Sequence, residues 1–129
     1  MIVRFDVDDP MRSFQARVEE SAQRTLRFSA ALEAIEATGR APGGEVSVRV
    51  NSAGGLADLR FHPEADRLSL DELARLVVET THRAQGRLAE HVGELVASVY
   101  GSDSGTAALI NEAYAKRYPK PAVDEENRR

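Results

Sequence analysis

The sequence has no cysteine and no tryptophan, and aromatic residues occupy only 5% of its 129 positions. The absence of cysteine excludes disulfide bonds, thiolate metal ligands and a cysteine nucleophile. With so few large rings, the core must consist mainly of Val, Leu, Ile and Ala, which suits helices packed on one another. No apolar run approaches the roughly 18 residues of a membrane-spanning helix. The acidic start lacks the apolar stretch of a cleavable signal, so we expect a cytoplasmic protein without a membrane partner.

Lysine is also scarce, because two lysines stand against fifteen arginines. The net charge of −4 argues mildly against a protein that coats nucleic acid through bulk positive charge. The charge is uneven, however. Residues 11–40 carry five Arg and four Glu, whereas residues 1–10, 41–68 and 69–100 are each net negative. The only segment with excess positive charge therefore coincides with the first predicted helix.

A long helix is predicted to begin at Asp9-Pro10, where an N-cap residue precedes a proline at the first helical position. It extends for about 25 residues and carries a stripe with heptad spacing, apolar except for two polar members in its middle. The stripe consists of Met11, Phe14, Val18, Ser21, Thr25, Phe28, Leu32 and Ile35. Residues 36–40 have two interpretations, as the last turn of this helix or as a short strand. The strand is the alternative because Thr38 is β-branched and Gly39 is a poor helix former.

The middle of the chain predicts a β-hairpin. Valines alternate with polar residues over residues 46–51, and a second alternating run covers residues 57–61. Ser52-Ala-Gly-Gly55 supplies a turn with glycines available for positive φ. Pro63 ends the second strand because proline donates no backbone hydrogen bond. One apolar and one polar face indicate an antiparallel sheet with one buried face and one face exposed to solvent.

A second long helix is predicted from the capping box Ser69-Leu-Asp-Glu72 to Tyr100, with Gly101 as its stop. Its expected inward stripe is Leu73, Val77, Thr81, Ala84, Leu88, Val92, Leu95 and Val99. Gly86 and Gly93 leave room for a close neighbour. A short helix over residues 106–117 follows, with Leu109, Ile110, Ala113 and Tyr114 expected to point inward. The tail from residue 119 is expected to be disordered. A narrow sheet cannot cover both long helices, so we expect the exposed stripe of one chain to meet that of a second.

Catalytic and metal-binding patterns are missing. His82 and His91 lie nine residues apart on one predicted helix and point to opposite sides. No His-x-x-x-His pair, nucleophile elbow, P-loop or Gly-x-Gly-x-x-Gly motif occurs. We therefore expect no enzyme, no catalytic residue, no cofactor and no metal site.

Arginines on the two long helices are the remaining candidates for function. They group by helix face as Arg17, Arg24 and Arg27 on the first helix, and Arg83 and Arg87 on the second. Guanidinium groups spaced along a helix can contact phosphates. The alternative is a solvated face on which these arginines pair with Glu20 and Glu79. The spacing alone leaves both interpretations open.

Four segments, taken in order, resemble the YbaB/EbfC family of bacterial nucleoid-associated proteins, in an actinobacterial-type form. They are Glu36-Ala-Thr-Gly39, Gly44-Glu-Val-Ser-Val-Arg-Val-Asn51, Leu59-Arg-Phe-His-Pro63 and Leu70-Asp-Glu-Leu-Ala-Arg-Leu-Val-Val78. The resemblance implies an α+β fold of long helix, three-stranded antiparallel meander and long helix, here followed by the short C-terminal helix. The resulting division is an N-terminal extension (1–10), a YbaB-like domain (11–100) and a C-terminal short helix with a disordered tail (101–129).

The resemblance further implies a homodimer with helices projecting like tweezer arms. It implies non-enzymatic binding of double-stranded DNA in the nucleoid, with contacts on both helices, here Arg17, Arg24, Arg27, Arg83 and Arg87. A second interpretation stays open, because some actinobacterial proteins resembling this fold are accessory proteins of type VII secretion loci that act through protein contacts. The Arg- and Ala-rich composition and the acidic net charge fit that alternative.

Overall fold

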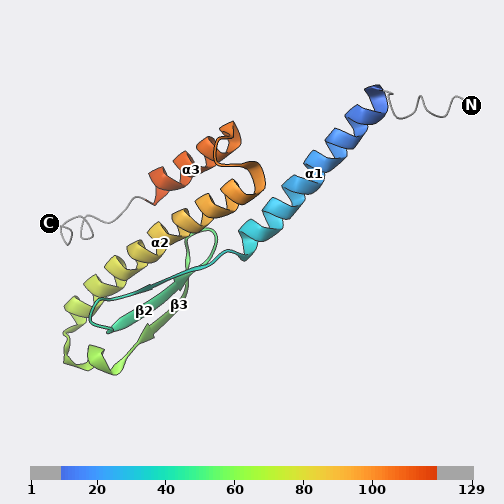
Figure 1. The fold of residues 1–129 in the computed structure, drawn as a ribbon. Coiled ribbons are helices and arrows are strands. Elements are labelled where there is room, and N and C mark those ends of the chain that lie inside the picture. The colour runs from blue at the N-terminus through green and yellow to red at the C-terminus, as the bar shows by residue number, and fades with distance from the viewer. Residues whose placement is uncertain (1–9, 119–129) are drawn as a thin grey trace, which may run out of the picture.

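The computed structural model describes residues 10–118. Helix α1 (Pro10–Ala34) leads into a three-stranded antiparallel sheet, which is followed by helix α2 (Leu70–Tyr100) and helix α3 (Gly105–Arg117) (Figure 1). The predicted α+β class and order of elements are confirmed, with the short C-terminal helix included. The predicted N-terminal extension up to residue 9 and the predicted disordered tail from residue 119 lie outside the described residues.

The sheet has the order β1 (Ala37–Arg40), β2 (Val46–Val50) and β3 (Leu56–Phe61). The alternative short strand at the end of the first helix is therefore confirmed as β1. In β2 the three valines are buried and the residues between them are half-exposed, as the alternation predicts. Helix α2 packs on the buried side and leaves the other face of the sheet open. Gly54 has a φ of 85°, so the hairpin turn uses a glycine for positive φ as expected.

Helix α2 begins at the predicted capping box. The Ser69 hydroxyl accepts a hydrogen bond from the Glu72 amide at 3.1 Å, and the Ser69 amide donates to Glu72 Oε1 at 3.1 Å. The hydrogen bond from the Ser69 backbone, followed by the one from its side chain, lowers the pKa of Glu72 below its ordinary value of 4.5. The helix ends at Gly101, which has a φ of 86°, so both predicted boundaries are confirmed.

The predicted buried stripe of α2 is confirmed at Ala84, Leu88 and Val92 but differs at its other positions. The residues that are buried lie four apart: Thr80, Ala84, Leu88, Val92 and Val96. The prediction placed Thr81 inside, but Thr81 is half-buried and its hydroxyl donates to the Val77 carbonyl at 2.7 Å. Leu73, Val77, Leu95 and Val99 are only partly buried and pack against the rim of the core. The small residues Thr80 and Ala84 face β1, where the backbone of Gly39 comes close to α2.

Helix α3 packs along α2 through a narrow line of residues. Ala107 is buried, and Ile110 and Tyr114 are half-buried as predicted. Leu109 is 71% exposed and Ala113 is also exposed, so the prediction that these two point inward is wrong. A helix that covers its neighbour only along positions three and four apart turns the intervening residues toward solvent. The predicted room beside Gly93 is taken by Asn111 of α3, whereas no described atom lies within 4 Å of a Cβ at Gly86.

Candidate nucleic-acid interface

Helix α1 leaves the core and projects past the end of α2 (Figure 1). Among residues 10–118, its C-terminal turns pack against the core. Phe28 packs edge to face on Tyr100 with ring centroids 5.4 Å apart, and Leu32 and Ile35 pack against the core. Within α1, all of which the structure describes, Phe28 is the only buried residue. Residues 10–27 therefore form a projecting helical arm, called here the α1 arm.

The apolar stripe of the α1 arm is exposed in the single chain. Met11, Phe14 and Val18 expose 61%, 55% and 51% of their surface. This is the uncovered stripe that the sequence predicts for a thin fold. Most helical stability in proteins comes from packing of an apolar face. The arm presents such a face to solvent.

The three predicted arginines of α1 all lie on the arm. Arg17 and Arg27 are exposed, and the side chain of Arg24 is 41% exposed. Arg24 lies 3.6 Å from Glu20, one turn earlier, which is a pairing that the alternative solvated face predicts. Exposed ion pairs of this kind contribute little to stability. The pairing therefore leaves the Arg24 guanidinium available to a stronger anion such as a phosphate.

The two predicted arginines of α2 lie beside the sheet. Arg83 is half-buried, and Arg87 is exposed. Arg87 reaches round the outer edge of β1, where its Nη1 donates to the Thr38 carbonyl at 3.4 Å. One turn later, His91 Nδ1 lies 3.2 Å from the carbonyl oxygen of Glu36. These two side chains cover the backbone edge of β1, which would otherwise be open to another strand.

A single chain does not bring the two groups of arginines together. Helix α1 runs antiparallel to α2, since Phe28 lies beside Tyr100 whereas Glu36, just after α1, lies beside His91. At a rise of 1.5 Å per residue, the helix geometry separates Arg17 from Arg87 by about 36 Å along this direction. The α1 arm and the sheet end of α2 are therefore two distinct regions of one chain.

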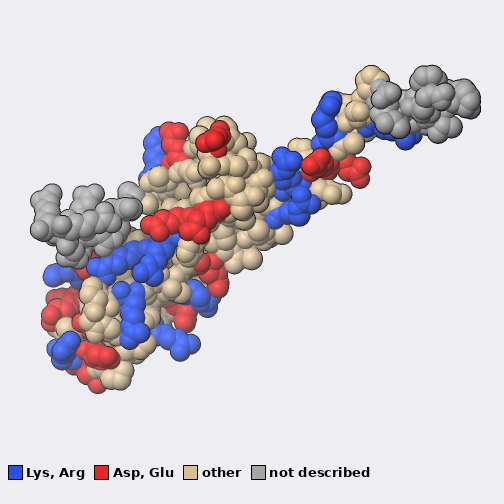
Figure 2. All heavy atoms as spheres, viewed as in Figure 1, with Lys and Arg blue, Asp and Glu red and all other residues tan. Residues whose placement is uncertain are grey.

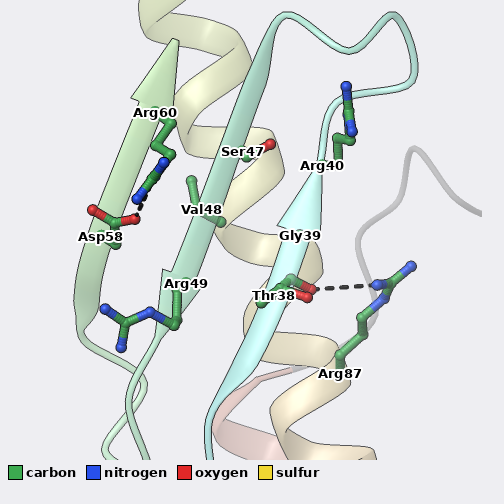
Figure 3. A pocket seen from close by; sticks show the side chains of 9 residues that line it. All are labelled: Thr38, Gly39, Arg40, Ser47, Val48, Arg49, Asp58, Arg60 and Arg87. Carbon is green, nitrogen blue, oxygen red and sulfur yellow. Dashed lines mark hydrogen bonds and ion pairs between the residues drawn. The ribbon is translucent and has the colours of Figure 1, made fainter. Parts of the chain in front are cut away.

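The open face of the sheet carries three further arginines that the sequence analysis did not single out. Arg40, Arg49 and Arg60 come one from each strand, and together with Arg87 they line a shallow depression of about 380 Å³ (Figure 3). Figure 2 shows basic side chains over the sheet region as well as along α1, with acidic ones among them. In the sequence these arginines occupy the polar half of alternating strands, which is also the pattern of an ordinary solvated face.

Other kinds of site lack support in the described part of the chain. No group of three or more His, Asp or Glu side chains is placed to hold a metal ion among residues 10–118. Over the same residues, no helix combines the length and apolarity needed to cross a membrane. The candidate interface is therefore built from the exposed arm and the two arginine-bearing surfaces of residues 10–118.

Comparison with known proteins agrees with this geometry. A model of the YbaB/EbfC DNA-binding family matches residues 8–103, which include α1, the whole sheet and α2. The resemblance drawn from the four sequence segments is confirmed. None of the curated proteins matches the chain significantly.

Proposed function

Because the chain belongs to the YbaB/EbfC DNA-binding family, we propose that it binds double-stranded DNA as a homodimer, without catalysis, through arginines of α1 and α2. Family membership implies nucleoid-associated DNA binding. The dimer and the arginine contacts at Arg17, Arg24, Arg27, Arg83 and Arg87 are the additional content of the proposal. The observation that carries it is the α1 arm, which holds exposed arginines beside the apolar side chains of Phe14 and Val18, more than half of whose surface is exposed.

A second copy of the chain is the occupant that we assign to the stripe of the α1 arm. Its apolar members Met11, Phe14 and Val18 lie on the heptad line that reaches Phe28 in the core beyond the polar positions Ser21 and Thr25. A twofold dimer lets the same stripe serve both chains. The resulting dimer has two arms. Over residues 10–27 each arm carries four arginines and two acidic residues, Glu19 and Glu20, so it has a net positive charge.

The dimer predicts the effect of removing the stripe. Phe14→Gln with Val18→Gln takes apolar surface from the arm but leaves its charge unchanged, so we expect a shift from dimer to monomer in sedimentation velocity. The matched control is Leu109→Gln on α3, where an exposed leucine is also lost. We expect this control to remain dimeric. A wild-type chain that sediments as a monomer at all concentrations would contradict the proposed dimer.

Charge reversal on the arm tests the DNA contacts. Arg17→Glu with Arg24→Glu places four negative charges on the two arms of the dimer, so we expect loss of the mobility shift of duplex DNA while the dimer survives. The control reverses Arg75 and Lys116, which are exposed on α2 and α3 and lie off the arm. Wild-type protein that gives no shift at about 50 mM salt, where phosphate contacts are strong, would remove the proposal.

The accessory role at a type VII secretion locus stays a prediction from the resemblance and the composition. No feature of residues 10–118 and no comparison favours it. It predicts that the purified protein retains a specific protein partner and gives no salt-dependent mobility shift. The DNA experiment above therefore separates the two functions.

A further inference from the structure

The arginines on the open face of the sheet form a regular pattern fixed by the strand register. Arg40 pairs with Ser47, which pairs with Arg60, so one row across the sheet has an arginine at each end. In the next row on this face, Arg49 stands in the centre between Thr38 and Asp58. At ordinary strand spacings the backbones of Arg40 and Arg60 are about 10 Å apart, and Arg49 lies about 7 Å further along the sheet.

These guanidinium groups keep most of their hydrogen-bonding capacity. Arg60 uses Nε alone, which donates to Asp58 at 3.1 Å, and Arg49 uses Nη1 to contact Glu36. Arg87 uses one N–H on the Thr38 carbonyl, and Arg40 makes no hydrogen bond or ion pair with residues 10–118. Since a guanidinium has five N–H donors, each of the four retains several for an external acceptor.

The depression has an excess of positive charge and a firm base. Four arginines and a single carboxylate, that of Asp58, line it. The strands beneath are held by α2 through fully buried side chains such as Val46 and Val50. On the same face the Ser47 hydroxyl is hydrogen-bonded to His62 Nε2 at 2.7 Å, which anchors the centre of the first row. The backbone positions of the arginines are therefore fixed relative to one another, whereas their guanidinium groups are exposed.

We infer that Arg40, Arg49, Arg60 and Arg87, called here the arginine face, contact the phosphate backbone of bound nucleic acid. This inference rests on the proposed function and adds a contact surface to the two helices. Arginine suits the role because its planar guanidinium binds phosphate oxygens with paired hydrogen bonds.

Arg87 belongs to both surfaces, because it starts on α2 and its guanidinium ends at the arginine face (Figure 3). DNA that contacts the sheet end of α2 is thereby brought next to Arg40, Arg49 and Arg60. Contacts of this kind hold the backbone and read no base edge. The arginine face should consequently contribute affinity equally to all DNA sequences.

The test compares the salt dependence of duplex DNA binding, measured by fluorescence anisotropy, for three double variants of the full chain. Arg40→Gln with Arg60→Gln removes two charges from the arginine face, and Arg75→Gln with Lys116→Gln removes two elsewhere. Each lost phosphate contact reduces the slope of log affinity against log salt by about 0.9, so two contacts reduce it by about 1.8 and weaken binding roughly 30-fold at 0.15 M salt. A dimer with both faces engaged shows twice this change in slope. Arg40→Lys with Arg60→Lys keeps the charges and should keep the slope.

The outcomes separate this inference from the proposed function. Wild-type protein that does not bind DNA overturns both. If wild type binds and the Arg17→Glu, Arg24→Glu variant does not, but the arginine-face variant keeps the slope of its control, the inference alone is overturned. Loss of the dimer in the arginine-face variant, seen by sedimentation, would make the face a protein interface and would likewise overturn it. Thermal unfolding of each variant confirms that the fold is intact.

Discussion

The contact between β1 and α2 predicts a large effect for the addition of one methyl group at Gly39. A Cβ built at this position lies 2.7 Å from the Thr80 carbonyl oxygen and 3.2 Å from both the amide nitrogen and the Cβ of Ala84. Ordinary contacts begin at 3.4 Å, so the strand and the helix must separate by several tenths of an ångström. Two of the three neighbours are backbone atoms, and no side-chain rotation relieves the overlap.

Overpacking of this kind typically costs 1–3 kcal/mol, and we expect Gly39→Ala to lower the free energy of unfolding by about 2 kcal/mol. Urea unfolding followed by circular dichroism measures this, at one fixed protein concentration because the stability of a dimer depends on concentration. With a slope of about 2 kcal/mol per molar urea, the midpoint falls by about 1 M.

Gly86→Ala is the matched control. Its Cβ meets nothing within 4 Å, and alanine in a helix is favoured over glycine by up to about 1 kcal/mol, so its midpoint should rise. A Gly39→Ala midpoint within about 0.2 M of wild type would contradict the close contact between β1 and α2.

Three further residues, Ser69, Glu72 and Leu88, give predictions that the same unfolding assay checks. Ser69→Ala removes the N-cap hydroxyl of α2 and should cost about 1 kcal/mol, and an unchanged midpoint would contradict the capping geometry. The pKa of Glu72 is lowered in the folded chain, so its charge stabilises the fold above the ordinary value of 4.5 and this contribution is lost as the pH falls through the lowered value. The difference in unfolding free energy between wild type and Glu72→Gln should therefore shrink on acidification. A difference that grows would mean that the pKa of Glu72 is not lowered in the folded chain. Leu88 is fully buried, and Leu88→Ala should cost about 2–5 kcal/mol, whereas a loss below about 1 kcal/mol would place it outside the core.

Local chemistry accounts for the parts of the fold that the sequence predicted well. Ser69 and Glu72 specify the start of α2 by direct hydrogen bonds, and Gly101 specifies its end through a positive φ. Each of these signals acts within a few residues and needs no knowledge of the rest of the chain. The short strand β1 was identifiable for the same reason, since Thr38 and Gly39 disfavour a further helical turn.

The choice of the buried face of α2 depends on tertiary contacts and was predicted less well. Apolar residues occupy more than one row of this helix, and periodicity does not reveal which row faces the sheet. The close approach of Gly39 selects the row containing Thr80 and Ala84, because only small side chains fit there. Leu109 was misplaced because α3 uses only a narrow line of contact, which its sequence does not mark.

The candidate site was predicted only as a set of positions on helices. The sequence identified Arg17, Arg24 and Arg27 on one helix face, and the structure places all three on a projecting arm. It could not reveal the arginine face, because the alignment of Arg40 and Arg60 across β2 is a product of strand register. Arg87 joins that face only because α2 crosses behind the sheet next to the edge of β1.

The salt dependence of wild-type binding to duplex DNA is the decisive measurement for phosphate binding by these arginines. If the arginines bind phosphates, log affinity falls linearly with log salt. If six or more arginines of the dimer contact phosphates, affinity should decrease by a factor of about 10³ or more between 50 and 200 mM salt. An affinity independent of salt, or no binding at about 50 mM salt, would contradict phosphate binding by the arginines of this chain.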